Sequence, residues 1–253
     1  MAGKFHEPSS VTSTASGESN GPEQTPSPMR LVVLGWRWPG KSLTANTILG
    51  REEFRLERAA EFSVTRHTEV AGRPVTVVDT PGWYSSQDTP LSYKKEITHG
   101  ATLCPPGPHA FLLVIPVGMF TEVDRARIEE HVGLFGERVW RHVLVVFTWA
   151  DMLRNISLER YIRREGAELQ HVLDKCRRRY VLVNNCVFQE RKQVAHLMEC
   201  VDRMVAEEGG HFQLEEDSQA IDENRNPTGD AVLQPKADDI GTLAEKAGAL
   251  STE

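Results

Sequence analysis

The chain has 253 residues, of which 40% are hydrophobic, 26% charged and 7% aromatic, and its formal net charge is −7. The charge is unevenly placed, because residues 213–253 carry ten Asp or Glu and three Lys or Arg. Residues 1–212 are therefore neutral overall. A neutral domain with an acidic end is a poor nucleic-acid binder, because phosphate contacts need a basic face, and we set that class aside.

The two ends of the chain differ in composition from its middle. Residues 1–29 contain 16 Ser, Thr, Gly or Pro, and residues 213–253 contain no aromatic residue, Cys or His. Neither end can bury enough apolar surface to offset the entropy of ordering. We predict a disordered N-terminal segment (1–29), one folded domain (30–212) and an acidic, disordered tail (213–253). The middle segment is long enough for one core and too short for two ordinary domains.

Nothing in the sequence indicates export or attachment to a membrane. No signal peptide is present, and the four cysteines lack CxxC spacing, which is typical of reduced thiols. The longest apolar stretch, residues 110–120, contains a Pro and a Gly and is too short to span a bilayer. Neither end carries a lipidation signal. We expect a cytoplasmic protein without an intrinsic membrane anchor.

Between residues 30 and 212, short apolar runs alternate with longer amphipathic segments. The runs are nearly continuous in Val, Leu and Ile, as expected of buried parallel strands, and comprise 31–34, 75–78, 111–115, 143–147 and 180–183. A hairpin at Gly72 adds an antiparallel strand. Helices are expected at 41–49, 123–135, 157–178 and 193–208, with Gly50 and Gly209 as C-terminal caps. The pattern predicts a three-layer α/β fold with a mainly parallel six-stranded sheet and one antiparallel edge strand.

The first predicted strand is followed by GWRWPGKS at residues 35–42, which matches the phosphate-binding pattern GxxxxGK[ST]. Backbone amides of such a loop and the N-terminus of the following helix bind phosphate groups. Lys41 is expected to pair with β- and γ-phosphate oxygens, and the Ser42 hydroxyl to ligate Mg²⁺. A strand before the motif and a helix after it give the pattern its required context.

The sequence DTPG at residues 79–82 follows the second of these apolar runs directly. From the end of that strand, Asp79 would reach the magnesium shell, and the Gly82 amide would sense a γ-phosphate. Such tetrapeptides also form simple turns. At this distance from a phosphate-binding loop, however, the motif favours a nucleotide-dependent switch.

The sequence TWAD at residues 148–151 follows a later run, and Asn184 and Asn185 follow the next one. The Asp151 carboxylate can accept both hydrogen bonds from the N1 and N2 edge of guanine, which adenine cannot supply. A helix N-cap is the alternative role for this residue. The two asparagines lie where a purine-contacting loop would arrive. Together with the earlier motifs they occupy successive strand ends at one edge of the sheet, where such folds bind ligands.

The segment PPGPHAFLLVIPVGMFTEVDRARIEEHVGLFG at 105–136 resembles the immunity-associated GTPases (GIMAP or IAN proteins), relatives of septins and chloroplast import GTPases. KSLTANTILG, SVT and VDRMVAEEGG also fit, and the resemblance covers roughly residues 30–212. It implies a P-loop G domain that binds GTP or GDP with Mg²⁺, with Thr65 as the switch threonine. We expect His109 to be a core histidine rather than a ligand. The expected GTP-binding residues are Gly35, Trp36, Arg37, Trp38, Pro39, Gly40, Lys41, Ser42, Leu43, Thr65, Asp79, Gly82, Thr148, Trp149, Asp151, Asn184 and Asn185, and the expected metal ligands are Ser42, Thr65 and Asp79.

Several residues depart from that family's pattern. Pro39 removes one amide donor from the phosphate loop, and Trp38 replaces a glycine. Trp83 stands where Ras-like enzymes carry a water-orienting glutamine, and Met119 stands where family members supply an arginine across a dimer interface. Trp149 replaces a basic residue and could stack on the base.

These observations lead to two hypotheses of different classes. The first is a guanine-nucleotide-binding switch that self-associates through its nucleotide face as a homodimer or homo-oligomer in the GTP state, with slow or absent hydrolysis. The alternative is a degenerate G-domain interaction module with little nucleotide affinity, because Trp38 and Pro39 weaken the phosphate loop. Arg37 either pairs with phosphate or obstructs the γ-phosphate. A P-loop kinase or ATPase is disfavoured by Asp151.

Overall fold

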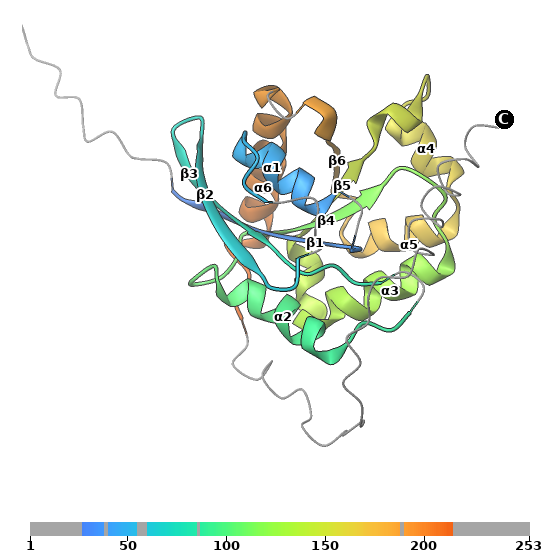
Figure 1. Cartoon of the computed structure of the whole chain (residues 1–253). Coiled ribbons are helices and arrows are strands. Elements are labelled where there is room, and N and C mark those ends of the chain that lie inside the picture. The colour runs from blue at the N-terminus through green and yellow to red at the C-terminus, as the bar shows by residue number, and fades with distance from the viewer. Residues whose placement is uncertain (1–26, 38–39, 55–59, 85–86, 188–189, 215–253) are drawn as a thin grey trace, which may run out of the picture.

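The structure is a computed structural model that describes residues 27–37, 40–54, 60–84, 87–187 and 190–214 (Figure 1). Trp38 and Pro39 of the phosphate-binding pattern lie outside the described residues. So do nearly all of the predicted N-terminal segment and nearly all of the predicted acidic tail.

Within the described residues, six strands form one sheet in the order β2-β3-β1-β4-β5-β6. β2 pairs antiparallel with β3, and the other neighbouring strands pair in parallel. The predicted fold class is therefore confirmed, including the antiparallel edge strand. The strands are β1 Met29–Gly35, β2 Val64–Val70, β3 Arg73–Asp79, β4 Ala110–Pro116, β5 Val143–Thr148 and β6 Tyr180–Leu182.

Helices cover both faces of the sheet, which gives three layers. The helices are α1 Lys41–Leu49, α2 Leu91–Thr102, α3 Glu122–Val132, α4 Leu158–Arg164, α5 Ala167–Lys175 and α6 Arg191–Glu208. Figure 1 shows α1 and α6 on one side of the sheet and α2 and α3 on the other. In the described part of the chain, no helix is both long and apolar enough to cross a bilayer.

The core divides into two hydrophobic clusters because successive residues of a strand face opposite sides of the sheet. In β1, Val32 and Leu34 pack in the cluster that contains α2 and α3, whereas Leu31 and Val33 pack in the cluster that contains α1 and α6. β4 and β5 are apolar on both faces along nearly their whole length, so the polar Thr148 lies at the end of its strand.

Helix boundaries follow local sequence signals, with two differences from prediction. The helix expected at 157–178 is two helices, because Gly166 interrupts it with φ +98°. The helix α2 was not predicted at all, since it buries only a few residues around Ile97. Gly50 and Gly209 end α1 and α6 in the left-handed conformation, as predicted, with φ +72° and +78°.

The segment Gly107–Pro108–His109 connects the start of the sheet to the C-terminal part of the domain. A Cβ at Gly107 would overlap the Phe212 carbonyl oxygen, and the Phe212 amide donates to the Pro108 carbonyl at 2.8 Å. The His109 Nδ1 atom accepts a hydrogen bond from the Arg30 amide at 3.0 Å. Each of these three residues thus has a specific packing or hydrogen-bonding role, and the half-buried His109 is held by Arg30 rather than by either core cluster.

Stability should fall in mild acid, because burial and the nearby Arg30 guanidinium lower the pKa of His109 to about 4. In the unfolded chain a histidine binds its proton near pH 6.5, so the unfolded state gains protons first as the pH falls. We expect the urea midpoint to drop between pH 7 and pH 5, and to drop less in His109→Asn. His67→Asn is the control, because His67 is exposed on β2. If the urea midpoint drops equally in His109→Asn and in the unchanged protein, the lowered pKa of His109 does not cause the loss of stability.

Candidate functional site

The predicted nucleotide-contacting residues gather at one edge of the sheet. β1 ends at Gly35, β3 at Asp79 and β5 at Thr148, and these strands are parallel to one another. The loop that begins at Gly35 leads into α1 at Lys41. The structure therefore brings the phosphate-binding loop, DTPG and TWAD to the same edge.

Lys41, Ser42 and Asp79 form a compact polar cluster at this edge. The Lys41 ammonium lies 3.3 Å from Asp79 Oδ1, and the Ser42 hydroxyl donates to Asp79 Oδ2 at 2.5 Å. Lys41 and Asp79 are both almost fully buried. A buried ammonium, a hydroxyl and a carboxylate at a helix N-terminus are the groups that a phosphate with its cation requires.

The oxygen atoms of Ser42 and Asp79 suit a Mg²⁺ ion that phosphate also coordinates, rather than a metal ion held by protein ligands alone. Among the described residues, no group of three or more His, Cys, Asp or Glu is arranged to hold a metal ion. Mg²⁺ commonly binds one or two protein oxygens and completes its shell with substrate phosphates and water. Ser42 and Asp79 fit that pattern, with phosphate oxygens supplying the remaining ligands.

The structure does not bring Thr65 to this cluster. Thr65 lies opposite Val78 in the antiparallel pair, whereas Val64 lies opposite Asp79. Directly opposed side chains share a face, so Thr65 faces the side of the sheet away from Asp79. Metal coordination by Thr65 would require β2 to separate from β3, and this role stays a prediction.

The phosphate-binding loop contacts the segment after β3 directly. The Arg37 amide donates to the Trp83 carbonyl at 2.8 Å, and the Trp83 amide donates to the Gly35 carbonyl at 3.3 Å. Trp36 and Trp83 form an isolated parallel bridge beyond the ends of their strands. A Cβ on Gly82 would lie 2.5 Å from the Arg37 nitrogen and 2.6 Å from the Trp36 carbonyl carbon, so only glycine fits there.

The Arg37 side chain is held by two tyrosines. Its Nη1 donates to the Tyr84 hydroxyl at 2.6 Å and lies 3.4 Å from the Tyr93 hydroxyl. Its guanidinium carbon is 5.0 Å from the Tyr84 ring centre and 5.6 Å from that of Tyr93, which is the range of cation–π contact. The sequence does not predict this cluster, because residue 37 is far from residues 84 and 93 in the chain and belongs to no common motif with them.

The TWAD segment lies against the phosphate-binding loop. The Thr148 hydroxyl is buried without a hydrogen-bond partner in the described part of the chain, and it lies 3.5 Å from where a Cβ on Gly40 would be. Trp149 is half-buried in the left-handed conformation, and the Asp151 side chain is exposed. Trp149, not Asp151, occupies the N-cap position of the short 3-10 helix here. The carboxylate is therefore free of the capping role.

Asn184 and Asn185 both make internal hydrogen bonds. Asn185 is buried, with its Nδ2 donating to the Thr44 hydroxyl at 3.0 Å and its Oδ1 accepting from the Thr47 hydroxyl at 2.9 Å. Asn184 Oδ1 accepts from the Cys186 amide. Asn185 therefore fixes the loop after β6 against α1, and contact of either side chain with a purine stays a prediction.

Two residues that bear on hydrolysis occupy different environments. Trp83 is fully buried and stacks on the His131 ring, with ring centres 4.7 Å apart. Met119 is half-exposed in the connection between β4 and α3, three residues before Glu122. Neither side chain can orient water or neutralise charge as a glutamine or an arginine does.

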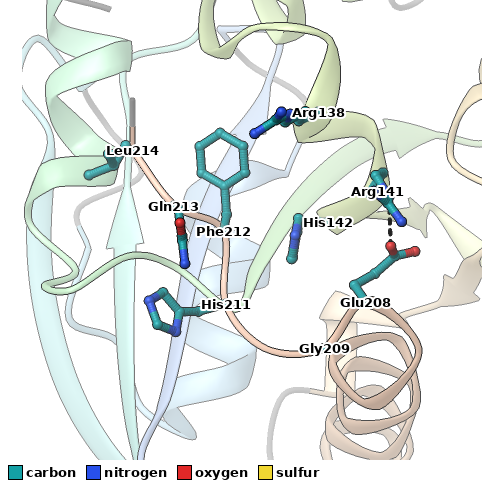
Figure 2. Close-up of a pocket in the computed structure, with 9 residues that line it drawn as sticks. All are labelled: Arg138, Arg141, His142, Glu208, Gly209, His211, Phe212, Gln213 and Leu214. Atoms are coloured by element: carbon teal, nitrogen blue, oxygen red, sulfur yellow. Dashed lines mark hydrogen bonds and ion pairs between the residues drawn. The ribbon is translucent and has the colours of Figure 1, made fainter. Parts of the chain in front are cut away.

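A hollow lies at the opposite edge of the sheet, beside His142, which directly precedes β5 (Figure 2). Its volume is about 350 Å³, and it is lined by Arg138, Arg141 and residues of the chain after α6. Arg141 donates to the buried Glu208 carboxylate at 2.8 Å. None of the predicted nucleotide-contacting residues lines this hollow. No sequence pattern predicts this hollow, because its walls come from segments more than 60 residues apart.

The AIG1 family model matches residues 29–231, which extends past the predicted end of the domain at residue 212. Human GTPase IMAP family member 8 is 32% identical over 201 residues, covering 76% of this chain and 29% of that protein. Immune-associated nucleotide-binding protein 9 of Arabidopsis thaliana is 34% identical over 204 residues, covering 76% of this chain and 58% of that protein. The chain thus spans less than two thirds of either relative, and the predicted resemblance is confirmed.

Toc33 from Arabidopsis thaliana has a similar fold. Its structure with Mg²⁺ and GMPPNP has a TM-score of 0.59 at 19% identity, covering 72% of this chain and 85% of that one. Its structure with GDP and Mg²⁺ has a TM-score of 0.60 at 17% identity, covering 75% of this chain and 88% of that one. At this identity the similarity shows the fold alone.

Asn185→Ala should lower the free energy of unfolding by about 1–3 kcal/mol, because it removes the amide that bonds the buried Thr44 hydroxyl and one of the two acceptors of the Thr47 hydroxyl. Urea denaturation without nucleotide measures the loss. Asn184→Ala is the matched control, because its side chain bonds within its own turn. Equal losses in the two variants would show that Asn185 does not fix the loop against α1.

Proposed function

We propose that this chain, which belongs to the AIG1 family, is a guanine-nucleotide-binding switch. It would self-associate in the GTP state and hydrolyse GTP slowly or not at all. The observation that carries the proposal is the convergence of Lys41 and Ser42 on Asp79 at the N-terminus of α1. The G domain spans the predicted residues 30–212, and we place the protein in the cytoplasm.

The proposed ligand is GTP or GDP with Mg²⁺. Lys41 would pair with β- and γ-phosphate oxygens, and Ser42 and Asp79 would hold the cation, which neutralises phosphate charge. Toc33, which shares the fold, was crystallised with GDP and Mg²⁺ and with GMPPNP and Mg²⁺. The unpartnered Thr148 hydroxyl beside Gly40 adds a polar group that faces the loop.

Selectivity for guanine rests on the segment after β5. Asp151 presents an exposed carboxylate at the edge of the sheet that also holds Lys41. Such a carboxylate can accept two hydrogen bonds from guanine, and Trp149 beside it offers an aromatic face to the base.

Self-association is proposed through the nucleotide face. A study of the Toc33 relatives describes dimerization as important for the GTPase activity of chloroplast translocon components. In this chain, Met119 and Val123 are exposed apolar side chains beside that face, with exposed fractions of 50% and 56%. Apolar side chains can stabilise a contact between copies, although methionine cannot stabilise transition-state charge.

Slow hydrolysis follows from the positions of three side chains. Trp83 is buried against His131, Met119 carries no charge, and Arg37 is bound to Tyr84 and Tyr93. Charge stabilisation by an arginine finger is worth about 10³–10⁵ in rate. Without it, the site supports only basal phosphoryl transfer.

The interaction module with little nucleotide affinity is the second candidate function. One observation favours it: the Arg37 amide, which belongs to the phosphate-binding loop, donates to the Trp83 carbonyl. The loop therefore has fewer amides for phosphate than its sequence pattern suggests, in addition to the donor that Pro39 lacks.

Guanine nucleotides should bind more tightly than adenine nucleotides, because only guanine satisfies the Asp151 carboxylate. Titration of fluorescent GDP and ADP measures the difference, and loss of a paired carboxylate–base contact typically costs a factor of about 10²–10⁴ in affinity. Asp151→Asn should shift preference toward xanthine nucleotides, and Asp174→Asn on α5 is the control. Equal affinity for GDP and ADP would rule out guanine recognition.

Single-turnover GTP hydrolysis should be slow, on the order of 10⁻⁴ s⁻¹ as in unassisted Ras. Met119→Arg should raise the rate by at least about ten-fold, and the gain should grow with protein concentration, because the arginine acts on a partner's nucleotide. Arg37→Thr tests the competing possibility that Arg37 acts within its own site. Fast hydrolysis by the unchanged protein that collapses in Arg37→Thr would contradict the slow switch.

A further inference from the structure

The phosphate-binding loop and DTPG are in direct backbone contact. In P-loop switch proteins, the γ-phosphate lies between the loop and the DxxG segment, whose movement it controls. Here the two backbones touch, because Gly82 packs directly on Arg37 and Trp36. Two hydrogen bonds between residues 35–37 and Trp83 hold them together.

Side chains reinforce this backbone contact on both sides. Trp36 and Trp83 are 7% and 0% exposed, and their ring centres lie 5.9 Å apart. Arg37 is bound at its other end to the hydroxyls and rings of Tyr84 and Tyr93. Separating the loop from DTPG therefore exposes indole surface and breaks charged hydrogen bonds together.

The groups that would bind the α- and β-phosphates are not involved in this contact. Gly40, Lys41 and Ser42 lie at the N-terminus of α1, where the amides and the helix dipole favour an anion. The side chains of Lys41 and Ser42 bond to Asp79, and neither hydrogen bond between the loop and Trp83 involves residues 40–42. A diphosphate can therefore bind while the loop stays against Gly82.

We propose that the contact of Trp36 and Arg37 with Gly82 and Trp83, secured by Tyr84 and Tyr93, makes the site selective for nucleoside diphosphates over triphosphates. The inference rests on the proposed nucleotide site and names what regulates it. A triphosphate binds only when the loop separates from Gly82. That separation has an energetic cost that a diphosphate avoids.

The same contact couples γ-phosphate binding to the proposed self-association surface, because the two tryptophans pack against residues beside that surface. Trp36 packs edge-on against Phe120, with ring centres 6.5 Å apart, and Trp83 stacks on His131 of α3. Phe120 directly follows the exposed Met119. Movement of the two tryptophans therefore changes the support under residues 119–120, which lie beside the face proposed to bind a second copy.

The test compares affinities for GDP and for GMPPNP, both with Mg²⁺, by competition against a fluorescent GDP. The unchanged protein should bind GDP at least about ten-fold more tightly, the effect of one or two lost hydrogen bonds. The double variant Tyr84→Phe/Tyr93→Phe should narrow that ratio at least about three-fold by raising GMPPNP affinity, with GDP affinity unchanged. Tyr180→Phe, a half-buried tyrosine that packs on Phe147, is the matched control.

Tryptophan emission gives a second readout. The base of either nucleotide can alter the emission of Trp149, but only GMPPNP should add the effect of exposing Trp36 and Trp83. Trp83→Phe should remove most of the difference between the two nucleotides. A ratio near one in the unchanged protein, or one that the double variant leaves unaltered, would overturn the inference while GDP binding still supports the nucleotide site. Absence of binding by either nucleotide would overturn both proposals.

Discussion

The ion pair between Lys41 and Asp79 is the interaction on which the functional edge of the molecule depends. Both groups are buried, at the point where β3 ends and α1 begins. Breaking a buried pair by removing one partner typically costs about 3–5 kcal/mol, because the other charge stays buried and uncompensated. In the proposed function, a phosphate with Mg²⁺ would replace this pair without leaving either charge alone, because the phosphate would bind Lys41 and the cation would bind Asp79.

The switch and the interaction module differ in how the phosphate-binding loop uses its backbone. In the structure, the loop extends the pairing of β1 with β3 through Trp36 and Trp83. The Arg37 amide therefore bonds to the Trp83 carbonyl and is not available to a phosphate. Under the proposal, this arrangement would lower affinity for a triphosphate while the helix N-terminus and Lys41 stay available to a diphosphate. The two candidate functions therefore differ only in nucleotide affinity. The free energy needed to separate Trp36 from Trp83 would decide which of them this chain has.

Much of the fold follows from sequence periodicity, because strands buried on both faces must be continuously apolar and glycine caps mark helix ends. The prediction of elements and contacts failed where the sequence pattern was weak or where the feature depends on tertiary packing. The helix α2 buries too little to show a periodic pattern, and Gly166 divides a segment whose polar and apolar residues otherwise suit one helix. For the site, the motifs predicted that the phosphate-binding loop, DTPG and TWAD share one edge of the sheet, as the structure shows. They did not give the face of Thr65, which depends on strand register, or the burial of Asn185 and the tyrosine contacts of Arg37, which depend on packing between distant segments.

The nucleotide content of the purified protein tests the central claim most directly. Protein purified in Mg²⁺ without added nucleotide is denatured, and the supernatant is separated by ion exchange and quantified against protein concentration. The account predicts guanine nucleotide, mainly GDP, in an amount approaching one per chain. Protein that carries none and takes up none when incubated with GDP, or that carries adenine nucleotide instead, would contradict it.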